Sequence, residues 1–159
     1  MTDRLYMETT QISAERTAAE ITALLARAGA KQVAGDYDKG QITGLHWIMQ
    51  VPGSGDMVFD MPARVLPVDK ILRTRRRGSL SLADAERIRA QAERVAWRLL
   101  LRWVQAQVAM IQTGMVEAGE VFFPYAQTPG GQTVYEVFKA RGLKELPAPP
   151  ARAELAAGK

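Results

Sequence analysis

Residues 81–113 of this 159-residue chain read SLADAERIRAQAERVAWRLLLRWVQAQVAMIQT, a stretch without proline or glycine. Ser81 with Asp84 three residues later resembles a capping box, in which the serine side chain accepts a hydrogen bond from the first turn of a helix. Gly114 follows directly and can adopt the left-handed conformation that ends many helices. The stretch therefore predicts one long helix, from Ser81 to about Thr113 and about 48 Å in length.

The predicted helix is apolar over far more of its circumference than a single buried face requires. Between Val95 and Ile111 about three-quarters of the helical wheel is apolar, including the large side chains of Trp97 and Trp103. Eight polar side chains fall in one narrow stripe, while Gln107 lies within the apolar arc. The stripe comprises Asp84, Arg87, Gln91, Arg94, Arg98, Arg102, Gln105 and Gln112. Because one small sheet cannot cover so much apolar surface, the pattern predicts a homo-oligomer, most simply a dimer.

Upstream of this helix, the hydrophobic pattern changes from helical spacing to alternation. Ser13 is a good N-cap for a first helix, and Gly29 is a good residue to end it. Alternating apolar residues and the turn sequence Asp38-Lys39-Gly40 then indicate strands joined by a tight hairpin. The predicted strands lie at residues 31–37, 41–51 and 57–61. They are expected to form a three-stranded antiparallel meander.

Shorter elements flank the long helix on both sides. Residues 65–72 predict a short helix before it, and residues 133–141 predict another after it. From Pro147 the sequence is rich in proline and alanine, which predicts a flexible tail. The fold class is therefore α+β, with an N-terminal helix, a three-stranded antiparallel meander, a long C-terminal helix and a short extension. Residues 1–146 are expected to form a single domain, and residues 147–159 the tail.

The positive charge of the chain is concentrated in one segment. Between Arg73 and Arg102 lie nine arginines and three carboxylates, which give this segment a formal charge of +6 although the whole chain carries +4. The nine are Arg73, Arg75, Arg76, Arg77, Arg87, Arg89, Arg94, Arg98 and Arg102. Arginine binds phosphate and carboxylate groups through two parallel hydrogen bonds, so this concentration points to an anionic ligand.

The candidate anion-binding residues form two sets, which are Arg73, Arg75, Arg76, Arg77 and Ser79 in a loop, and Arg94, Arg98 and Arg102 on the long helix. The loop set comes just before a helix N-terminus, whose free N–H groups favour anions. The helix set recurs every four residues, so its side chains are expected in one stripe. A solvated edge of the helix is the alternative interpretation of these arginines. Tyr125, which follows a proline in a loop, is the aromatic residue best placed to stack on a base.

Composition narrows the classes of function. The chain has no cysteine, which excludes disulfides, thiolate metal sites and cysteine nucleophiles. Its N-terminus has no apolar signal core, so secretion is not expected. The most apolar run is interrupted by Arg98 and Arg102, which no unpaired bilayer span tolerates. These features predict a cytoplasmic protein with no membrane partner.

No catalytic motif accompanies the arginines. His46 is the only histidine and lies on a predicted strand, where a half-buried structural position is more common than a catalytic one. Asp36 and Asp38, like Asp56 and Asp60, lie near strand ends and could hold Mg²⁺ or act as acid and base. Aspartate is also common in turns for local hydrogen bonding, which is the simpler explanation. The sequence therefore predicts no catalytic residue, no bound metal and no cofactor, with an enzyme kept as an alternative.

Six short stretches carry a resemblance to known sequences. They are residues 8–10 (ETT), 13–17 (SAERT), 25–30 (LARAGA), 60–64 (DMPAR), 94–98 (RVAWR) and 121–125 (VFFPY), of which the last two are the most specific. Taken together they resemble an uncharacterised family of small bacteriophage and prophage proteins, over residues 6–140. The resemblance implies a phage context, and hence a host cytoplasm, and it transfers no catalytic residue.

The leading hypothesis is a non-enzymatic phage-type protein that binds a polyanion through these arginines, either a nucleic acid or a nucleotide messenger. The second hypothesis is a protein-interaction factor, for instance a counter-defence inhibitor that binds an acidic surface of a host protein. A metal-dependent nuclease or nucleotide hydrolase that uses the aspartates comes third. DNA, RNA and a small nucleotide are equally consistent with the sequence as ligands.

Overall fold

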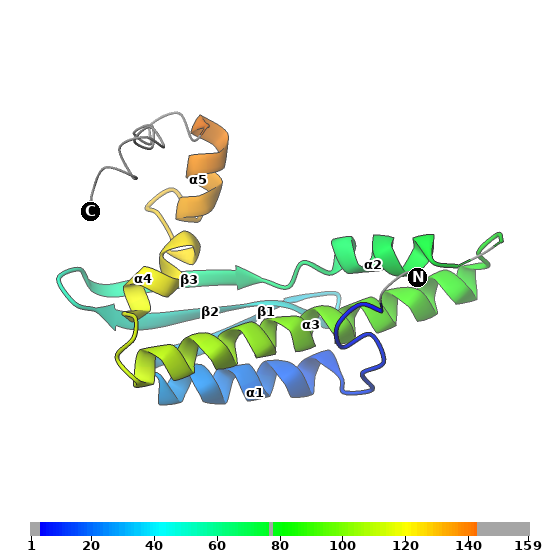
Figure 1. Cartoon of the computed structure of the whole chain (residues 1–159). Coiled ribbons are helices and arrows are strands. Elements are labelled where there is room, and N and C mark those ends of the chain that lie inside the picture. The colour runs from blue at the N-terminus through cyan, green and yellow to red at the C-terminus, as the bar shows by residue number, and fades with distance from the viewer. Residues whose placement is uncertain (1–3, 77, 143–159) are drawn as a thin grey trace, which may run out of the picture.

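The computed structural model describes residues 4–76 and 78–142 and shows helices packed on a small sheet (Figure 1). In chain order the elements are α1 (Ala14–Arg27), β1 (Ala30–Asp38), β2 (Gln41–Val51), β3 (Gly55–Pro62), α2 (Val65–Thr74), α3 (Leu82–Gln112), α4 (Ala118–Phe122), the 3₁₀ helix η1 (Phe123–Tyr125) and α5 (Val134–Arg141). The predicted α+β fold class is confirmed. The tail predicted at residues 147–159 lies outside the described residues.

The sheet is an antiparallel meander in which β2 lies between β1 and β3. The hairpin between β1 and β2 turns at Lys39 and Gly40, which both have positive φ, as the favoured two-residue hairpin turns require. At the middle of the sheet, Trp47 of β2 pairs with Val33 of β1 and with Phe59 of β3. The predicted meander and its first turn are therefore confirmed.

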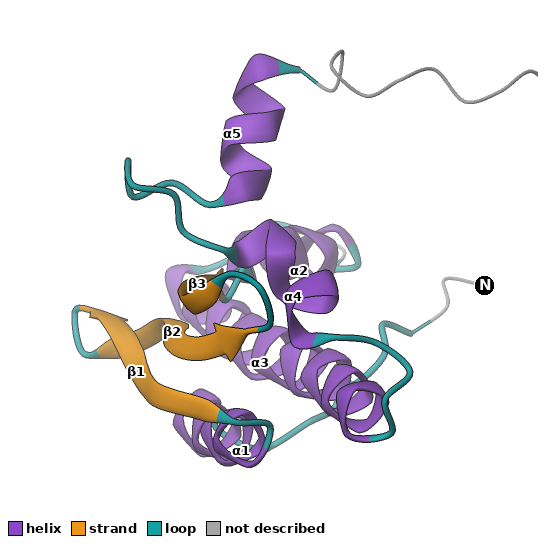
Figure 2. Ribbon diagram, turned by 90° about the vertical axis from the view of Figure 1, so that its left-hand side faces the viewer, coloured by secondary structure: helices purple, strands orange, loops and turns teal. Residues whose placement is uncertain are grey.

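The helices α1 and α3 lie side by side against one face of the sheet (Figures 1 and 2). Trp47 and Phe59 of the sheet, Ile21 of α1, and Trp97 and Leu101 of α3 are completely buried in one core cluster. The alternation of β2 aims its large side chains at these helices and leaves the opposite face of the sheet partly open to solvent. One face of the sheet thus belongs to the core, and the other has partly exposed side chains.

Both ends of α3 follow the local signals in the sequence. The Ser81 side chain accepts a hydrogen bond from the Asp84 backbone N–H at 3.1 Å, and Thr113 is the C-cap, followed by Gly114 with a φ of 74°. The short helix α2 packs on the first half of α3, beyond the end of the sheet (Figure 1). It extends to Thr74, two residues past its predicted end, so Arg73 belongs to a helix and not to a loop.

The segment after α3 completes the core of the domain. Phe122 is fully buried, and its ring centroid lies 5.2 Å from that of Trp47, 6.0 Å from that of Phe59 and 5.9 Å from that of Trp103. The chain then forms a bridge with the edge strand β3, where the Gln127 backbone N–H donates to the Val58 carbonyl at 2.8 Å. The C-terminal extension therefore supplies a core residue and covers part of an exposed sheet edge.

The apolar surface of α3 is covered more fully by its own chain than the helical wheel suggested. The sheet, α1, α2 and α4 together bury most of it, and Leu99, Leu100 and Trp103 remain half-buried along a shallow groove of about 320 Å³. The predicted dimer therefore has a smaller apolar surface to bury than the sequence implied. It stays a prediction.

Sedimentation tests the dimer directly. At micromolar concentration the chain should sediment as a dimer, and Leu100→Glu should dissociate it, because an unpaired charge in an apolar interface costs several kcal/mol. Ala106→Glu, at an exposed position of the same helix, is the control and should leave the dimer intact. A 17.5 kDa monomer for the unmodified chain would contradict the prediction.

Candidate anion-binding groove

An open groove lies where the N-terminal segment, residues 4–11, runs beside the first half of α3 (Figure 1). Its third wall is the end of α2 and the residues that follow it, and its volume is about 590 Å³. Five of the lining side chains are arginines and one is a carboxylate, namely Arg4, Arg75, Arg76, Arg87, Arg94 and Glu8. Three separate segments of the chain, one of them distant in sequence from the other two, thus combine to form one positive surface.

Gln91 fixes the N-terminal segment to α3. Its side-chain amide donates hydrogen bonds to the backbone oxygens of Glu8, at 2.7 Å, and of Thr10, at 3.0 Å. Its Oε1 accepts two hydrogen bonds from the Arg94 guanidinium, at 3.0 and 2.7 Å. Arg94 is therefore oriented before any ligand binds, which reduces the side-chain entropy lost on binding.

Carboxylates hold two further arginines of the groove in place. Arg75 forms an ion pair with Glu8, and both side chains are about a quarter exposed. Arg76 Nη1 lies 2.7 Å from Asp84 Oδ1, and hydrogen bonds from the Ser81 hydroxyl and from Arg76 hold the pKa of Asp84 below its usual range. Arg87 approaches the same carboxylate only to 3.7 Å, and its side chain is 73% exposed. Of these three arginines, Arg87 is thus the most exposed to a ligand.

The groove contains some of the predicted anion-binding residues together with two that were not predicted. Arg75, Arg76 and Arg94 were predicted and line the groove, whereas Arg4 and Arg87 were not predicted and line it as well. Arg87 lies in the polar stripe of the helical wheel, so the spacing along α3 was enough to predict it as a binding residue. Arg4 is far from α3 in the sequence, and only the folded N-terminal segment brings it there.

Four predicted residues in the described part of the chain, Arg73, Ser79, Arg98 and Arg102, do not line this groove. Arg73 pairs with Asp69 within α2, at 2.7 Å. Ser79 is exposed on the connection to α3, and Arg102 is exposed farther along α3, where it donates to Gln105. Arg77 lies outside the described residues. Of the two predicted sets of arginines, only Arg75 and Arg76 after α2 and Arg94 on α3 therefore lie together in the groove.

Arg98 departs most from its predicted position. Its side chain is 8% exposed, and its Nη1 donates to both carboxylate oxygens of Glu20 on α1, at 3.2 and 3.1 Å. Arg94, Arg98 and Arg102 therefore do not form one open stripe, because α1 packs over the middle member. The periodicity of α3 placed the three arginines on one side of the helix, but it contained no information about which part of that side α1 would cover.

This ion pair predicts an asymmetric loss of stability. Glu20→Ala leaves the Arg98 guanidinium buried without its counter-ion and should lower the free energy of unfolding by about 3 kcal/mol. Arg98→Met should cost less, because the Glu20 side chain is 39% exposed and also lies 4.0 Å from Arg16. Urea unfolding of the two variants measures the difference, with Glu20→Gln, which keeps an acceptor, as the control. An equal or larger loss in Arg98→Met would contradict this account.

On the partly open face of the sheet, two carboxylates flank the single histidine. His46 Nδ1 lies 3.1 Å from Asp36 Oδ1, and Asp60 is the cross-strand partner of His46. Burial and the nearby Asp36 raise the pKa of the Asp60 carboxyl above its ordinary value, while His46 acts in the opposite direction. The three side chains form a row across the sheet that could exchange protons with a ligand bound beside it.

The aspartates are grouped differently from the pairs that the sequence suggested. Asp56 lies apart from Asp60 in an ion pair with Lys31, at 2.6 Å, and Asp38 is exposed at the first hairpin. Within residues 4–76 and 78–142, no group of three or more histidine, aspartate or glutamate side chains is arranged to hold a metal ion.

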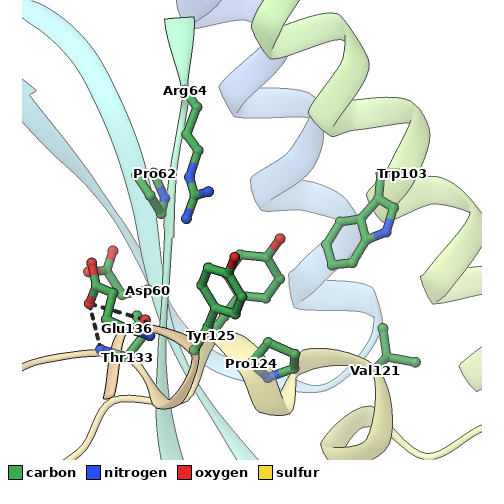
Figure 3. A pocket seen from close by; sticks show the side chains of 10 residues that line it. Asp60, Pro62, Arg64, Trp103, Val121, Pro124, Tyr125, Thr133 and Glu136 are labelled. Carbon is green, nitrogen blue, oxygen red and sulfur yellow. Dashed lines mark hydrogen bonds between the residues drawn. The ribbon is translucent and has the colours of Figure 1, made fainter. Parts of the chain in front are cut away.

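Tyr125, predicted as a stacking residue, lies in a separate pocket beside Asp60 (Figure 3). Its ring centroid is 5.5 Å from that of Trp103, so it is partly occupied by contact with α3. The pocket does not share a lining residue with the arginine groove. Tyr125 is therefore not placed to stack on a base bound in the arginine groove.

Comparison of the chain with protein-family models, with curated proteins and with solved structures found no match. Among the described residues, none of the helices has the length and apolar character needed to cross a membrane.

Proposed function

We propose that this protein binds a polyanion, a nucleic acid or a nucleotide, in the groove between the N-terminal segment, α2 and α3, and that it does so without catalysis. The observation that supports this most is the convergence of five arginines on one groove, where two carboxylates, Glu8 in the lining and Asp84 beside it, offset part of the charge. The five are Arg4, Arg75, Arg76, Arg87 and Arg94. Guanidinium groups bind phosphate oxygens in pairs of hydrogen bonds, and several of them around one groove favour a ligand with several negative charges.

The dimensions of the groove suit either kind of ligand. From Arg87 to Arg94 the helix rises by about 10 Å, a length along which one strand of duplex DNA presents about three phosphates. Its volume of about 590 Å³ also falls within the range of about 300–1,000 Å³ that is common for small-ligand pockets. The phage context that the sequence resemblance implies is compatible with both ligands.

Equilibrium binding to labelled DNA and RNA, single-stranded and duplex, and to linear and cyclic nucleotides tests the proposal. A nucleic acid should bind with an affinity that falls steeply with salt, since phosphate contacts release counter-ions. A nucleotide should saturate one site per chain and show a shallow salt dependence. If none of them binds above background, the proposal is wrong, and a protein partner with an acidic surface becomes the leading hypothesis.

The row of Asp36, His46 and Asp60 is the observation that favours the enzymatic alternative. Each bound ligand should therefore be incubated with the protein and Mg²⁺, Mn²⁺ or Zn²⁺, and the products analysed by chromatography. On our proposal the ligand stays intact. Turnover that is lost in His46→Ala or Asp60→Asn would instead establish a hydrolase.

A further inference from the structure

The pocket around Tyr125 has the chemistry of a site for a proline-rich segment. It has a volume of about 370 Å³ and lies between the edge strand β3, α3, η1 and the start of α5. Its walls include the rings of Trp103, Tyr125 and Tyr135 and the side chains of Pro62 and Pro124. Figure 3 shows the rings of Tyr125 and Trp103 beside each other, with Asp60 and Glu136 across the pocket. Surfaces of aromatic rings are the common receptors for proline-rich segments, whose rigid extended form loses little entropy on binding.

The charges of the pocket favour a cationic residue in the bound segment. Its lining contains two carboxylates, Asp60 and Glu136, and one guanidinium, Arg64. The Arg64 guanidinium lies 5.9 Å from the centroid of the Tyr135 ring, within the range of a cation–π contact. Tyr135 is 48% exposed, so part of its surface remains accessible to a second group.

The chain itself contains a segment of this composition. Residues 147–152 read PAPPAR, with prolines at 147 and 150 and an arginine at 152. In the polyproline II conformation three residues make one turn, so the two prolines would contact the same surface and the arginine would follow them at one end. No other stretch of the sequence places three prolines within four residues.

The length of the chain allows this segment to reach the pocket. The start of α5, at Thr133, Tyr135 and Glu136, lies in the pocket wall, and the described chain ends at Gly142 just after this helix. The eight residues of α5 rise by about 12 Å. The five residues from Gly142 to residue 147 span at most about 17 Å, which suffices to return along the helix.

We propose that residues 147–152 of this chain bind in the pocket formed by Trp103, Tyr125 and Tyr135, with the arginine directed at Asp60 and Glu136. The pocket is then an interaction site for proline-rich basic segments that the chain occupies with its own segment. Its residues do not overlap those of the arginine groove, so this site stands independently of the proposed function.

Acrylamide quenching of tryptophan fluorescence tests the contact in the full chain. Trp47 and Trp97 are completely buried, so quenching reports mainly on Trp103, which is half-buried in this pocket. Replacing the prolines at 147, 149 and 150 by alanine should increase quenching, at concentrations where the chain is monomeric. No change in quenching would overturn the proposal. Shielding that appears only as the concentration rises would also overturn it, because a second copy would then supply the segment.

A synthetic peptide with the sequence of residues 145–154 provides the second test. It should bind the proline variant of the full chain, and bind the unmodified chain more weakly because the pocket is occupied. With a Kd of about 0.1 mM for the peptide and an effective concentration of about 1 mM for the tethered segment, the difference is about tenfold. Equal binding to both chains, or no binding to the variant, would contradict the proposal.

The pocket itself is tested with Tyr135→Ser in the background of the proline variant. This exposed residue lines the pocket, so its loss should weaken peptide binding by about tenfold without unfolding the domain. Tyr37→Ser is the matched control, because Tyr37 is 64% exposed on β1 and lines no part of the pocket. Similar losses in both variants would show that the peptide binds elsewhere and would sink the proposal.

Discussion

Replacing Arg76, Arg87 and Arg94 together by alanine should weaken polyanion binding by about a hundredfold, since each lost charge-assisted contact costs about 1 kcal/mol in a partly hydrated groove. For duplex DNA or RNA, the slope of log affinity against log salt should also become flatter, by up to about 0.9 for each lost phosphate contact. Fluorescence polarisation over a salt series measures both quantities. All three side chains line the groove and none of them is buried, so the fold should survive.

The matched control removes the same charge from distant positions. Arg27, Lys139 and Arg141 are exposed at the end of α1 and on α5, remote from the groove (Figure 1). Their joint replacement by alanine should reduce affinity only through the general field of the protein, and so only slightly at moderate salt. An equal loss in both triple variants would mean that the ligand responds to net charge and that the groove is not its site.

A substitution of Arg98 distinguishes binding in the groove from binding along the arginine stripe that the sequence suggested. Because the Arg98 side chain is buried against Glu20, Arg98→Met should leave polyanion affinity unchanged even though it lowers stability. A large loss of affinity in a variant that remains folded would restore the continuous arginine stripe as the binding surface.

Phe122→Ala should lower the free energy of unfolding by about 4 kcal/mol, the largest loss expected from a single substitution. The ring is completely buried against Trp47, Phe59 and Trp103, and its removal leaves a cavity between the sheet and α3. For a chain of this size the melting temperature should fall by about 10 °C. Urea unfolding followed by tryptophan fluorescence measures the loss.

Phe123→Ala is the control, since the neighbouring ring is 52% exposed and should contribute less than about 0.5 kcal/mol. Comparing the two variants tests whether α4 unfolds together with the rest of the core or separately from it. Equal and small effects would show that the segment after α3 detaches without unfolding the domain. The proposed pocket around Tyr125 would then lack a stable wall.

Some features of the candidate site were readable in the sequence. Arg75 and Arg76 follow a helix of modest length, and Arg94 lies on the polar side of α3, so local spacing was enough to select them. The helical wheel also contained Arg87. It could not supply Arg4 or the role of Gln91, because both depend on the N-terminal segment crossing α3, a contact between residues some eighty positions apart.

The elements of this fold were determined by signals that act over a few residues. The Ser81 cap, the positive φ available at Gly40 and the alternation along β2 each depend on neighbours within about one turn or one hairpin. The sequence alone therefore predicted where α3 begins, where the first hairpin turns and that residues 41–51 form a strand. Tertiary structure decided the rest. The burial of Arg98 against Glu20, the row of Asp36, His46 and Asp60, and the groove of five arginines each require side chains from different elements to meet. Such meetings depend on how whole faces pack together, and the periodicity of a single element shows which residues share a face but not what that face will contact.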